Sequence, residues 1–276
     1  MPVRWEVLAS GSSGNASLLD LDGRRLLLDA GLSPSKLTGL LADVGVDWSG
    51  IHALLLTHTH SDHWHPGVLE ELLARRIPLF CHSGHRATLQ LNGPAFVPLA
   101  LGGLVRYFEA SRRFSPIPGV NCTPHTVPHD GGPTFGFRLE GTTGAQRGEW
   151  AIAYAADLGS WDRGLAPAFA NVDVLALEFN HDLDLQKGSK RPPWLVARVL
   201  GDQGHLSNHQ GARLLKECIH HSRPDRLKHV VQLHVSQECN RTELAADVAR
   251  AILEEFQVGA ELHTTIQGVR GPSIEL

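Results

Sequence analysis

The chain has 276 residues, 42% of them hydrophobic, and a formal net charge of -4. This length predicts one domain over residues 1–276 with a substantial core, and the charge argues weakly against a nucleic-acid partner without excluding one bound in a local basic groove. The sequence has no apolar run near the ~18 residues of a membrane span and no signal-peptide pattern, so we expect a cytoplasmic protein with no membrane partner. It has no Cys-x-x-Cys pair, so we expect no disulfide scaffold. No obligate protein partner is evident.

The N-terminal part is predicted to alternate strands with helices. The second and third strands form a hairpin that turns at Asp22-Gly23. The first helix is expected to have Ser33 as its N-cap and Pro34 as its first residue. The expected strands are 3–9, 16–21, 24–28, 51–56 and 77–81, and the expected helices are 67–76 and 85–91 after the one that begins at Pro34.

The C-terminal part is predicted to be β structure first and mixed afterwards. Residues 102–140 consist of short runs with aromatic residues and Gly/Pro punctuation, which indicates strands. Strands are then expected at 150–155, 172–177, 229–233 and 260–266, and helices at 192–200, 209–221 and 242–256, the last capped by Thr242. Since strands and helices interleave without a linker, we expect an α/β sandwich with sheets inside and helices outside.

Polar residues directly follow several of the apolar strands. They are Asp29, His58, Asp157, Glu178 and His234. Side chains at the same end of neighbouring strands converge in space, which is the usual place for a site. We therefore expect the functional site at this edge.

The segment Thr57-His58-Thr59-His60-Ser61-Asp62-His63 is the strongest chemical signal in the chain. Imidazole and carboxylate are ligands that suit zinc, manganese and iron. His58, His60 and Asp62 alternate toward one side, while His63 adds a ligand from the next direction, so the segment can serve two ions. Two ions a few ångström apart supply a nucleophile and a charge clamp for a phosphoryl or acyl transition state. The alternative, a histidine-rich loop that arose by chance, is a poor explanation for four ligand-type residues at the end of one strand.

A polar loop follows the first strand and has two interpretations. It has the sequence Ser10-Gly11-Ser12-Ser13-Gly14-Asn15. Its backbone N–H groups, the hydroxyls of Ser10, Ser12 and Ser13, and Asn15 suit a phosphate oxygen. The alternative is an ordinary tight turn before a hairpin.

Two later segments also suggest phosphate binding. In Gly204-His205-Leu206-Ser207-Asn208, either Ser207 or Asn208 is expected to cap a helix, and a helix N-terminus also binds phosphate. His205 would then be a phosphate ligand or a general acid. Asn180 and His181 would line the same pocket or satisfy local backbone groups.

These motifs resemble a known fold and, within it, a known family. Asp29-Ala30-Gly31, His58-x-His60-x-Asp62-His63, a lone downstream histidine, Asp157 and a strand-end histidine resemble the metallo-β-lactamase fold, a four-layered αββα sandwich. The 10–15 loop, Glu178-Phe179-Asn180-His181-Asp182, the 204–208 segment and Leu233-His234-Val235-Ser236 resemble the YycJ (WalJ) family of hydrolases. The resemblance covers residues 4–265.

The resemblance implies a ligand set for two divalent metal ions, zinc or manganese, with iron compatible. The first ion would be held by His58, His60 and His129, the second by Asp62, His63 and His234, and Asp157 would bridge them. Asp29 would accept a hydrogen bond from a ligand imidazole. His125 is the alternative to His129, and His229 and His205 are the alternatives to His234. Asp29 and Asp157 also fit ordinary turn positions.

The resemblance further implies a two-metal phosphodiesterase, most similar to a 5′-to-3′ DNA exonuclease that acts in DNA repair. Asp62 would orient the attacking water, and His205 would protonate the leaving oxygen. The alternatives are a phosphodiesterase for small cyclic phosphates, a thioester or lactone hydrolase, and a non-catalytic metal-binding module. The sequence has two small basic groups, one of Lys187, Lys190 and Arg191 and one of Arg112 and Arg113. Each group is either an ordinary solvated surface or, if both flank the metals, a set of contacts for a phosphate backbone.

Overall fold

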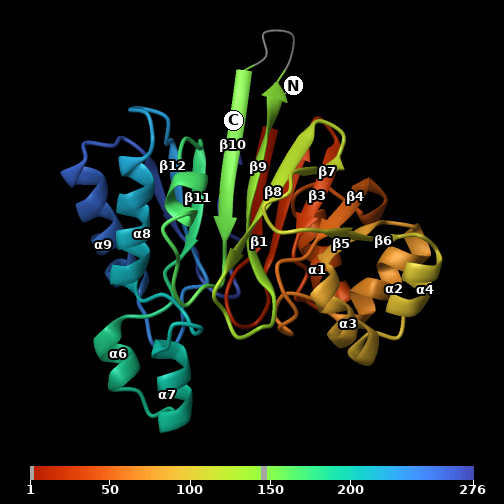
Figure 1. The fold of residues 1–276 in the computed structure, drawn as a ribbon, viewed down its shortest axis with the longest axis horizontal. Helices are drawn as coiled ribbons and strands as arrows, with labels where there is room; N and C mark the ends of the chain where they lie inside the picture. Colours follow the sequence, from red (N-terminus) through yellow and green to blue (C-terminus); the bar gives the residue numbers. More distant parts are fainter. Residues whose placement is uncertain (1–2, 144–147) are drawn as a thin grey trace.

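Two seven-stranded mixed sheets form the centre of the structure (Figure 1). It is a computed structural model that describes residues 3–143 and 148–276; Met1 and Pro2, where no signal-peptide pattern was found, lie outside them. Sheet A has the order β14-β1-β2-β3-β4-β5-β6, and sheet B the order β13-β12-β11-β10-β9-β8-β7. In sheet A the strands are β1 (Val3–Ala9), β2 (Ala16–Leu21), β3 (Arg24–Leu28), β4 (Ile51–Leu55), β5 (Leu79–His82), β6 (Val105–Phe108) and β14 (Ser273–Glu275). In sheet B they are β7 (Phe114–Ile117), β8 (Val120–Val127), β9 (Thr134–Thr143), β10 (Gly148–Ala155), β11 (Val174–Glu178), β12 (His229–Leu233) and β13 (Glu261–Thr264).

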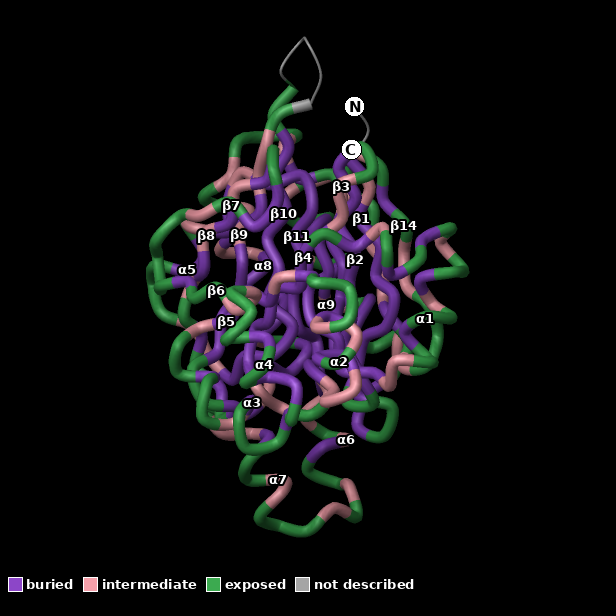
Figure 2. The backbone as a smooth tube through the Cα atoms, turned by 90° about the vertical axis from the view of Figure 1, so that its right-hand side faces the viewer, coloured by how far each residue is buried: buried purple, intermediate pink, exposed green. Residues whose placement is uncertain are grey.

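Helices cover the outer face of each sheet. Sheet A carries α1 (Pro34–Ala42), α2 (Pro66–Arg75), α3 (Arg86–Asn92) and α4 (Phe96–Leu101), with short 3-10 turns at Trp48–Gly50 and Ser83–His85. Sheet B carries α5 (Leu165–Ala168), α8 (Asn208–His220) and α9 (Thr242–Glu255). Two further helices, α6 (Leu183–Lys187) and α7 (Pro193–Leu200), project beyond the layers (Figures 1 and 2).

Three hydrophobic cores show that the arrangement has four layers. On β3, Leu26 and Leu28 face the core between the two sheets, whereas Leu27 faces the core under the helices of sheet A. The third core lies between sheet B and its helices. Since both faces of each sheet are covered, the central strands are apolar throughout rather than alternating. The predicted four-layered αββα sandwich is confirmed.

Several local predictions differ from the structure. Thr242 is wrong as a cap, because it is the first residue of α9 and its hydroxyl contacts Glu243, while Arg241 is the N-cap and makes no side-chain cap bond. Ser33 is the N-cap of α1, but its hydroxyl makes no cap bond either. The helices α4, α5 and α6 and the strand β14 were not predicted, because they have three to six residues and too few turns or alternations for a clear period.

The strand directions determine where strand ends meet. Strands β3, β4 and β5 of sheet A run parallel, as do β10, β11 and β12 of sheet B. The carboxyl ends within each of these groups therefore lie at the same edge. Among the described residues no helix combines the length and the apolar character needed to cross a membrane.

Candidate metal centre

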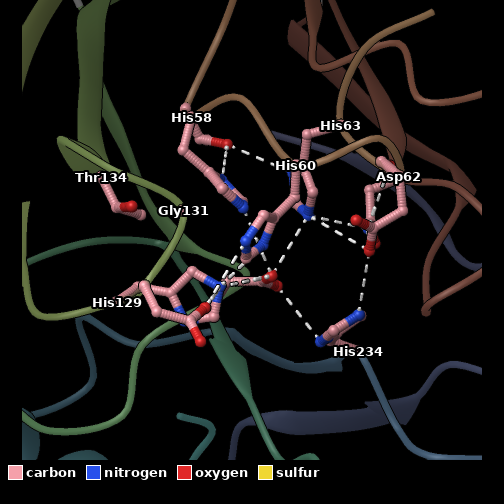
Figure 3. Close-up of polar contacts among 12 residues, drawn as sticks. His58, His60, Asp62, His63, His129, Gly131, Thr134 and His234 are labelled. Carbon is pink, nitrogen blue, oxygen red and sulfur yellow. Dashed lines mark hydrogen bonds and ion pairs between the residues drawn. The ribbon is translucent and has the colours of Figure 1, made fainter. Parts of the chain in front are cut away.

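Polar side chains that follow the strands converge in space, and Figure 3 shows His58 and His234 among them, together with His60, Asp62, His63 and His129. Asp29 follows β3, and His234 follows β12. Both have positive φ, 58° for Asp29 and 52° for His234, a left-handed conformation that is uncommon outside glycine. The backbone N–H of Asp29 donates to the Leu55 carbonyl, and that of His234 donates to the Ser10 hydroxyl. These contacts hold the turns that carry both side chains into the site.

The first predicted ligand group is assembled in the structure. It consists of His58, His60, His129 and Asp157, whose ligand atoms all lie within 4.8 Å of one another. Nε2 of His129 is 3.4 Å from Oδ2 of Asp157 and 3.2 Å from Nδ1 of His60. Nε2 of His58 is 3.6 Å from the same carboxylate oxygen. One divalent ion fits among three imidazoles and a carboxylate at these separations.

The second predicted group lies on the other side of Asp157. Asp62, His63 and Asp157 again offer ligand atoms within 4.8 Å. Nε2 of His63 is 3.3 Å from Oδ2 of Asp157. His234 contacts both carboxylates, with Nε2 3.4 Å from Asp62 and Nδ1 3.1 Å from Asp157 (Figure 3). Asp157 is therefore common to the two groups, the position expected of a bridging carboxylate.

Atoms without partners support the fit to metal ions. Within the described residues, Nε2 of His58, Oδ1 of Asp157 and Nε2 of His234 are buried and make no hydrogen bond, although each faces an oppositely charged group of the cluster at 3.6, 3.1 and 3.4 Å, respectively. Buried polar atoms nearly always make a hydrogen bond, so three that make none in one cluster indicate a bound ligand. Their chemistry, two imidazole nitrogens and a carboxylate oxygen, matches a divalent ion.

The charges of the cluster favour exchange of protons for metal ions. Burial holds the pKa of His58 well below its usual range, which leaves the neutral imidazole that binds metals. Burial also acts on His234, but Asp157, Asp62 and Glu178 outweigh it and raise the pKa to about 10. The carboxylates thus hold a proton on His234 that a divalent ion would displace.

Neighbouring residues fix the orientation of the imidazoles. Oδ2 of Asp29 is 2.8 Å from Nδ1 of His63, and Asp29 also accepts hydrogen bonds from the backbone and hydroxyl of Thr57. Nδ1 of His129 is 2.8 Å from the Gly204 carbonyl. In both rings the remaining nitrogen, Nε2, faces the cluster, as the predicted role of Asp29 requires.

Glu178 lies among the candidate ligands, although the sequence assigned it no role of its own. It is fully buried, and Oε1 is 2.7 Å from Nδ1 of His205 and 3.0 Å from Nδ1 of His234. Oε2 accepts the backbone N–H groups of Leu158 and Leu206. The sequence signal for Glu178 was its position as an acidic residue at the end of an apolar strand. Glu178 joins a predicted ligand to the predicted general acid.

His205 lies beside the two ligand groups. Its ring centroid is 5.0 Å from that of His129 and 5.0 Å from that of His234, and its side chain is 12% exposed. Because Nδ1 is engaged by Glu178, Nε2 is the nitrogen available to a substrate.

The Ser10–Asn15 loop divides into inward and outward residues. Ser10 accepts the His234 N–H, and Nδ2 of Asn15 lies 3.0 Å from Nε2 of His63 and 3.3 Å from Oδ2 of Asp62. Ser12 and Ser13 are exposed. Ser10 and Asn15 therefore support the ligands, while the phosphate role of the loop stays a prediction.

The other residues predicted to line the pocket are buried in the loops around it. Asn180 donates to the His234 carbonyl at 2.8 Å. Ser207 caps α8 in a capping box with Gln210, and Asn208 exchanges two side-chain hydrogen bonds with Asn240. His181 is fully buried, and burial lowers its pKa to about 4. These contacts position His205 and His234, and a direct substrate contact stays a prediction.

Two of the three alternatives to the predicted ligands lie elsewhere, whereas the third, His205, lies in one group with Asp157, Glu178 and His234. His125 is on β8, with its ring against Phe169. His229 is at the opposite end of β12 from His234, where it contacts His263. Of the two basic groups, Arg113 lies in a surface cavity with Trp150, at the far end of β10 from Asp157. Lys187, Lys190 and Arg191 are in α6 and the turn before α7.

Comparisons with known proteins agree with this geometry. A beta-lactamase superfamily domain matches residues 24–234. Exodeoxyribonuclease WalJ of Streptococcus pneumoniae is 30% identical over 243 residues, which cover 88% of this chain and 85% of that protein. The chain belongs to the WalJ family of the metallo-β-lactamase superfamily.

Other relatives extend the match over nearly the whole chain. Exodeoxyribonuclease YycJ of Bacillus anthracis is 26% identical over 276 residues, 96% of each protein. The metallo-β-lactamase fold protein YhfI of Bacillus subtilis superimposes with a TM-score of 0.70 at 16% identity and 99% coverage of each chain, which shows the shared fold. The chain is accordingly a metallo-β-lactamase-fold hydrolase, with His/Asp clusters suited to divalent metal ions.

Proposed function

We propose that this WalJ-family chain is a two-metal exodeoxyribonuclease that degrades DNA in the 5′-to-3′ direction in DNA repair. The observation that carries the proposal is that Asp157 belongs both to the group of His58, His60 and His129 and to the group of Asp62 and His63, while His234 contacts Asp62 and Asp157. His58, His60 and His129 would hold one ion, and Asp62, His63 and His234 the other. Two ions, zinc or manganese, would supply an activated water and Lewis-acid stabilisation of the phosphoryl transition state.

The protein's own residues would supply orientation and a proton. Asp62 reaches both His63 and His234 from the second ligand group, where its carboxylate can also orient the attacking water. Glu178 fixes the ring of His205 through Nδ1. Nε2 of His205 is then placed to protonate the leaving 3′ oxygen of the nucleotide removed from the 5′ end.

The test is a nuclease assay on single-stranded DNA with a 5′ phosphate or a 5′ hydroxyl, with manganese or zinc added to metal-free protein. Asp62→Ala and His205→Ala are expected to lower kcat by about 10²-fold or more, the usual contribution of a general acid or base. Products released from the labelled 5′ end would report the polarity.

Two exposed residues supply matched controls. Asp247→Ala on α9 and His221→Ala after α8 remove the same side-chain types far from the ligands and should leave kcat unchanged. Wild-type activity in Asp62→Ala would contradict the mechanism. Turnover of a cyclic phosphodiester without cleavage of any DNA would contradict the DNA substrate.

A further inference from the structure

A second group of potential metal ligands lies at the opposite end of β12 from the candidate metal centre. It consists of His229, Glu261 and His263, whose ligand atoms all lie within 4.8 Å of one another. We call these three residues the edge triad, because β13, which carries two of them, is the edge strand of sheet B. His229 begins β12 and His234 follows its end, which separates the two sites by about 16 Å at the rise of a β-strand. The two sites therefore cannot share an ion.

The register of β12 and β13 places the three side chains of the edge triad on one face of sheet B. The strands are parallel, with His229 opposite Glu261 and Val231 opposite His263. Residues two apart along a strand point to the same face, and so do residues paired across neighbouring strands. Because Val231 packs into the core between the sheets, the edge triad lies at the margin of that core. Two hydrogen-bonded strands, rather than a loop, thus hold the three residues together.

The distances within the edge triad are close to those between the ligands of one zinc ion. Nδ1 of His229 is 3.2 Å from Nε2 of His263. Oε2 of Glu261 is 3.5 Å from the first nitrogen, and Oε1 is 3.8 Å from the second. Zinc–nitrogen bonds of about 2.0–2.1 Å place two ligands of a tetrahedral ion about 3.3 Å apart. Glu261 is 67% exposed, so its carboxylate is free to turn toward an ion held by the two rings.

The charges around the edge triad favour a bound cation. In the described part of the chain, the carboxylate of Glu261 forms ion-pair contacts with the two histidines and with no lysine or arginine. Lys228, the residue before His229, pairs with Asp173 instead. Burial lowers the pKa of both histidines, which favours neutral rings. A hydrogen bond between the two rings accounts for their 3.2 Å contact, but it leaves the carboxylate without a positive partner.

We propose that the edge triad is a metal site separate from the candidate metal centre, which binds a zinc ion and ties β13 to β12. Two imidazoles and one carboxylate are an established ligand set for zinc, with water in the fourth position. Manganese binds such ligands most weakly in the first-row series, so the site selects zinc over manganese. An edge strand has one side without a strand partner, and a metal bridge to β12 holds it in place. The inference goes beyond the proposed nuclease function and does not depend on it.

Zinc stoichiometry tests the site. After equilibrium dialysis against zinc chloride, the wild type should hold one zinc ion more per chain than His229→Gln or His263→Gln, because glutamine keeps a hydrogen-bonding group but is a poor zinc ligand. Glu261→Gln should weaken binding of that ion at least about tenfold, since even the loss of a residue that orients a ligand costs 10- to 100-fold. His52→Gln, which changes an exposed histidine on β4, is the matched control and should bind as much zinc as the wild type.

Amide hydrogen exchange tests the effect on the edge strand. Zinc should slow exchange of the β13 amides in the wild type, because the bridge to β12 opposes local opening of the edge. The same concentration of zinc should slow these amides much less in His263→Gln, where the bridge cannot form. Manganese should leave exchange of β13 nearly the same in both proteins.

The outcomes separate this inference from the proposed function. Equal zinc content in the wild type and in both histidine variants would overturn the site and leave a hydrogen bond between two rings. An equal loss of zinc in His52→Gln would show general binding to surface histidines instead. The kcat on DNA should be unchanged in His263→Gln, and a fall would contradict a site separate from the candidate metal centre. If the wild type cleaves no DNA but still holds the additional zinc ion, the nuclease proposal fails and the edge triad stands.

Discussion

At the scale of single residues, a few buried carboxylates connect the metal ligands to their surroundings. Asp29 holds His63, and Glu178 holds both His234 and His205. Because each carboxylate also accepts backbone N–H groups at strand ends, its position is determined by the sheets. The ligand imidazoles are thus held in place by the rigid strands.

Glu178→Gln should impair both metal binding and turnover. An amide has one acceptor oxygen, so it cannot serve the two histidines on one side and the two backbone N–H groups on the other. We expect metal affinity and kcat each to fall about 10- to 100-fold, the usual effect of losing a partner that orients a ligand. Metal titration and steady-state kinetics measure the two effects.

The matched control for this change is Glu140→Gln. Glu140 also forms ion pairs, with Arg138 and Arg113, but on β9 away from the ligands. It should leave metal affinity and kcat unchanged. Wild-type values for both quantities in Glu178→Gln would show that the carboxylate has no such role.

At the scale of elements, close backbone contacts position the His58–His63 segment. Gly31 N–H donates to the Asn15 carbonyl, Asn15 N–H donates to the Asp62 carbonyl, and Ala30 N–H donates to the His63 carbonyl. Three segments from different strand ends thus meet at Gly31. A Cβ at this position would overlap the carbonyl group of Asp62.

Gly31→Ala is expected to move Asp62 and His63 and so weaken the second ligand group. Overpacking of this kind costs about 1–3 kcal/mol in the free energy of unfolding. Urea denaturation would measure the loss of stability, and metal titration the loss of one bound equivalent. Gly39→Ala on α1 is the control: a Cβ there meets open space, and alanine should stabilise the helix by about 0.5–1 kcal/mol. Full metal binding in Gly31→Ala would refute the argument.

At the scale of the whole molecule, the candidate metal centre joins the two sheets. His58 and Asp62 come from the sheet A side, and Asp157 and His234 from the sheet B side. Without ions, buried atoms of His58, Asp157 and His234 have no hydrogen-bond partner. Bound ions should therefore stabilise the packing of the sheets.

Removal of metal is expected to lower Tm. A ligand present at 100 times its Kd stabilises the folded state by about 2.7 kcal/mol, which in a chain of this size corresponds to several degrees. Thermal unfolding with EDTA, and then after addition of zinc or manganese, would show the shift. The Tm of Asp157→Asn should rise much less when metal is added, because this variant lacks the charged bridging carboxylate. Equal Tm values for metal-free and metal-loaded wild type would rule out this contribution.

The sequence alone was sufficient for the fold and for the prediction that His and Asp side chains cluster at the strand ends. Apolar strands followed by polar residues, and the dense His58–His63 motif, predicted the layered sandwich and a metal centre at the strand ends, because these signals are local. Short elements such as α4 and α6 escaped prediction, since so few residues show no clear period.

Only the tertiary structure decided how residues distant in the chain combine. It brings His129 rather than His125 to the cluster, and it places Glu178 between His205 and His234. It also brings Arg198 of α7 into an ion pair with Asp130, which lies 3.5 Å from His60. Local patterns identify which residues can do chemistry. Which of these residues meet depends on strand order and loop packing. Strand order and loop packing are set by contacts between segments that are far apart in the sequence.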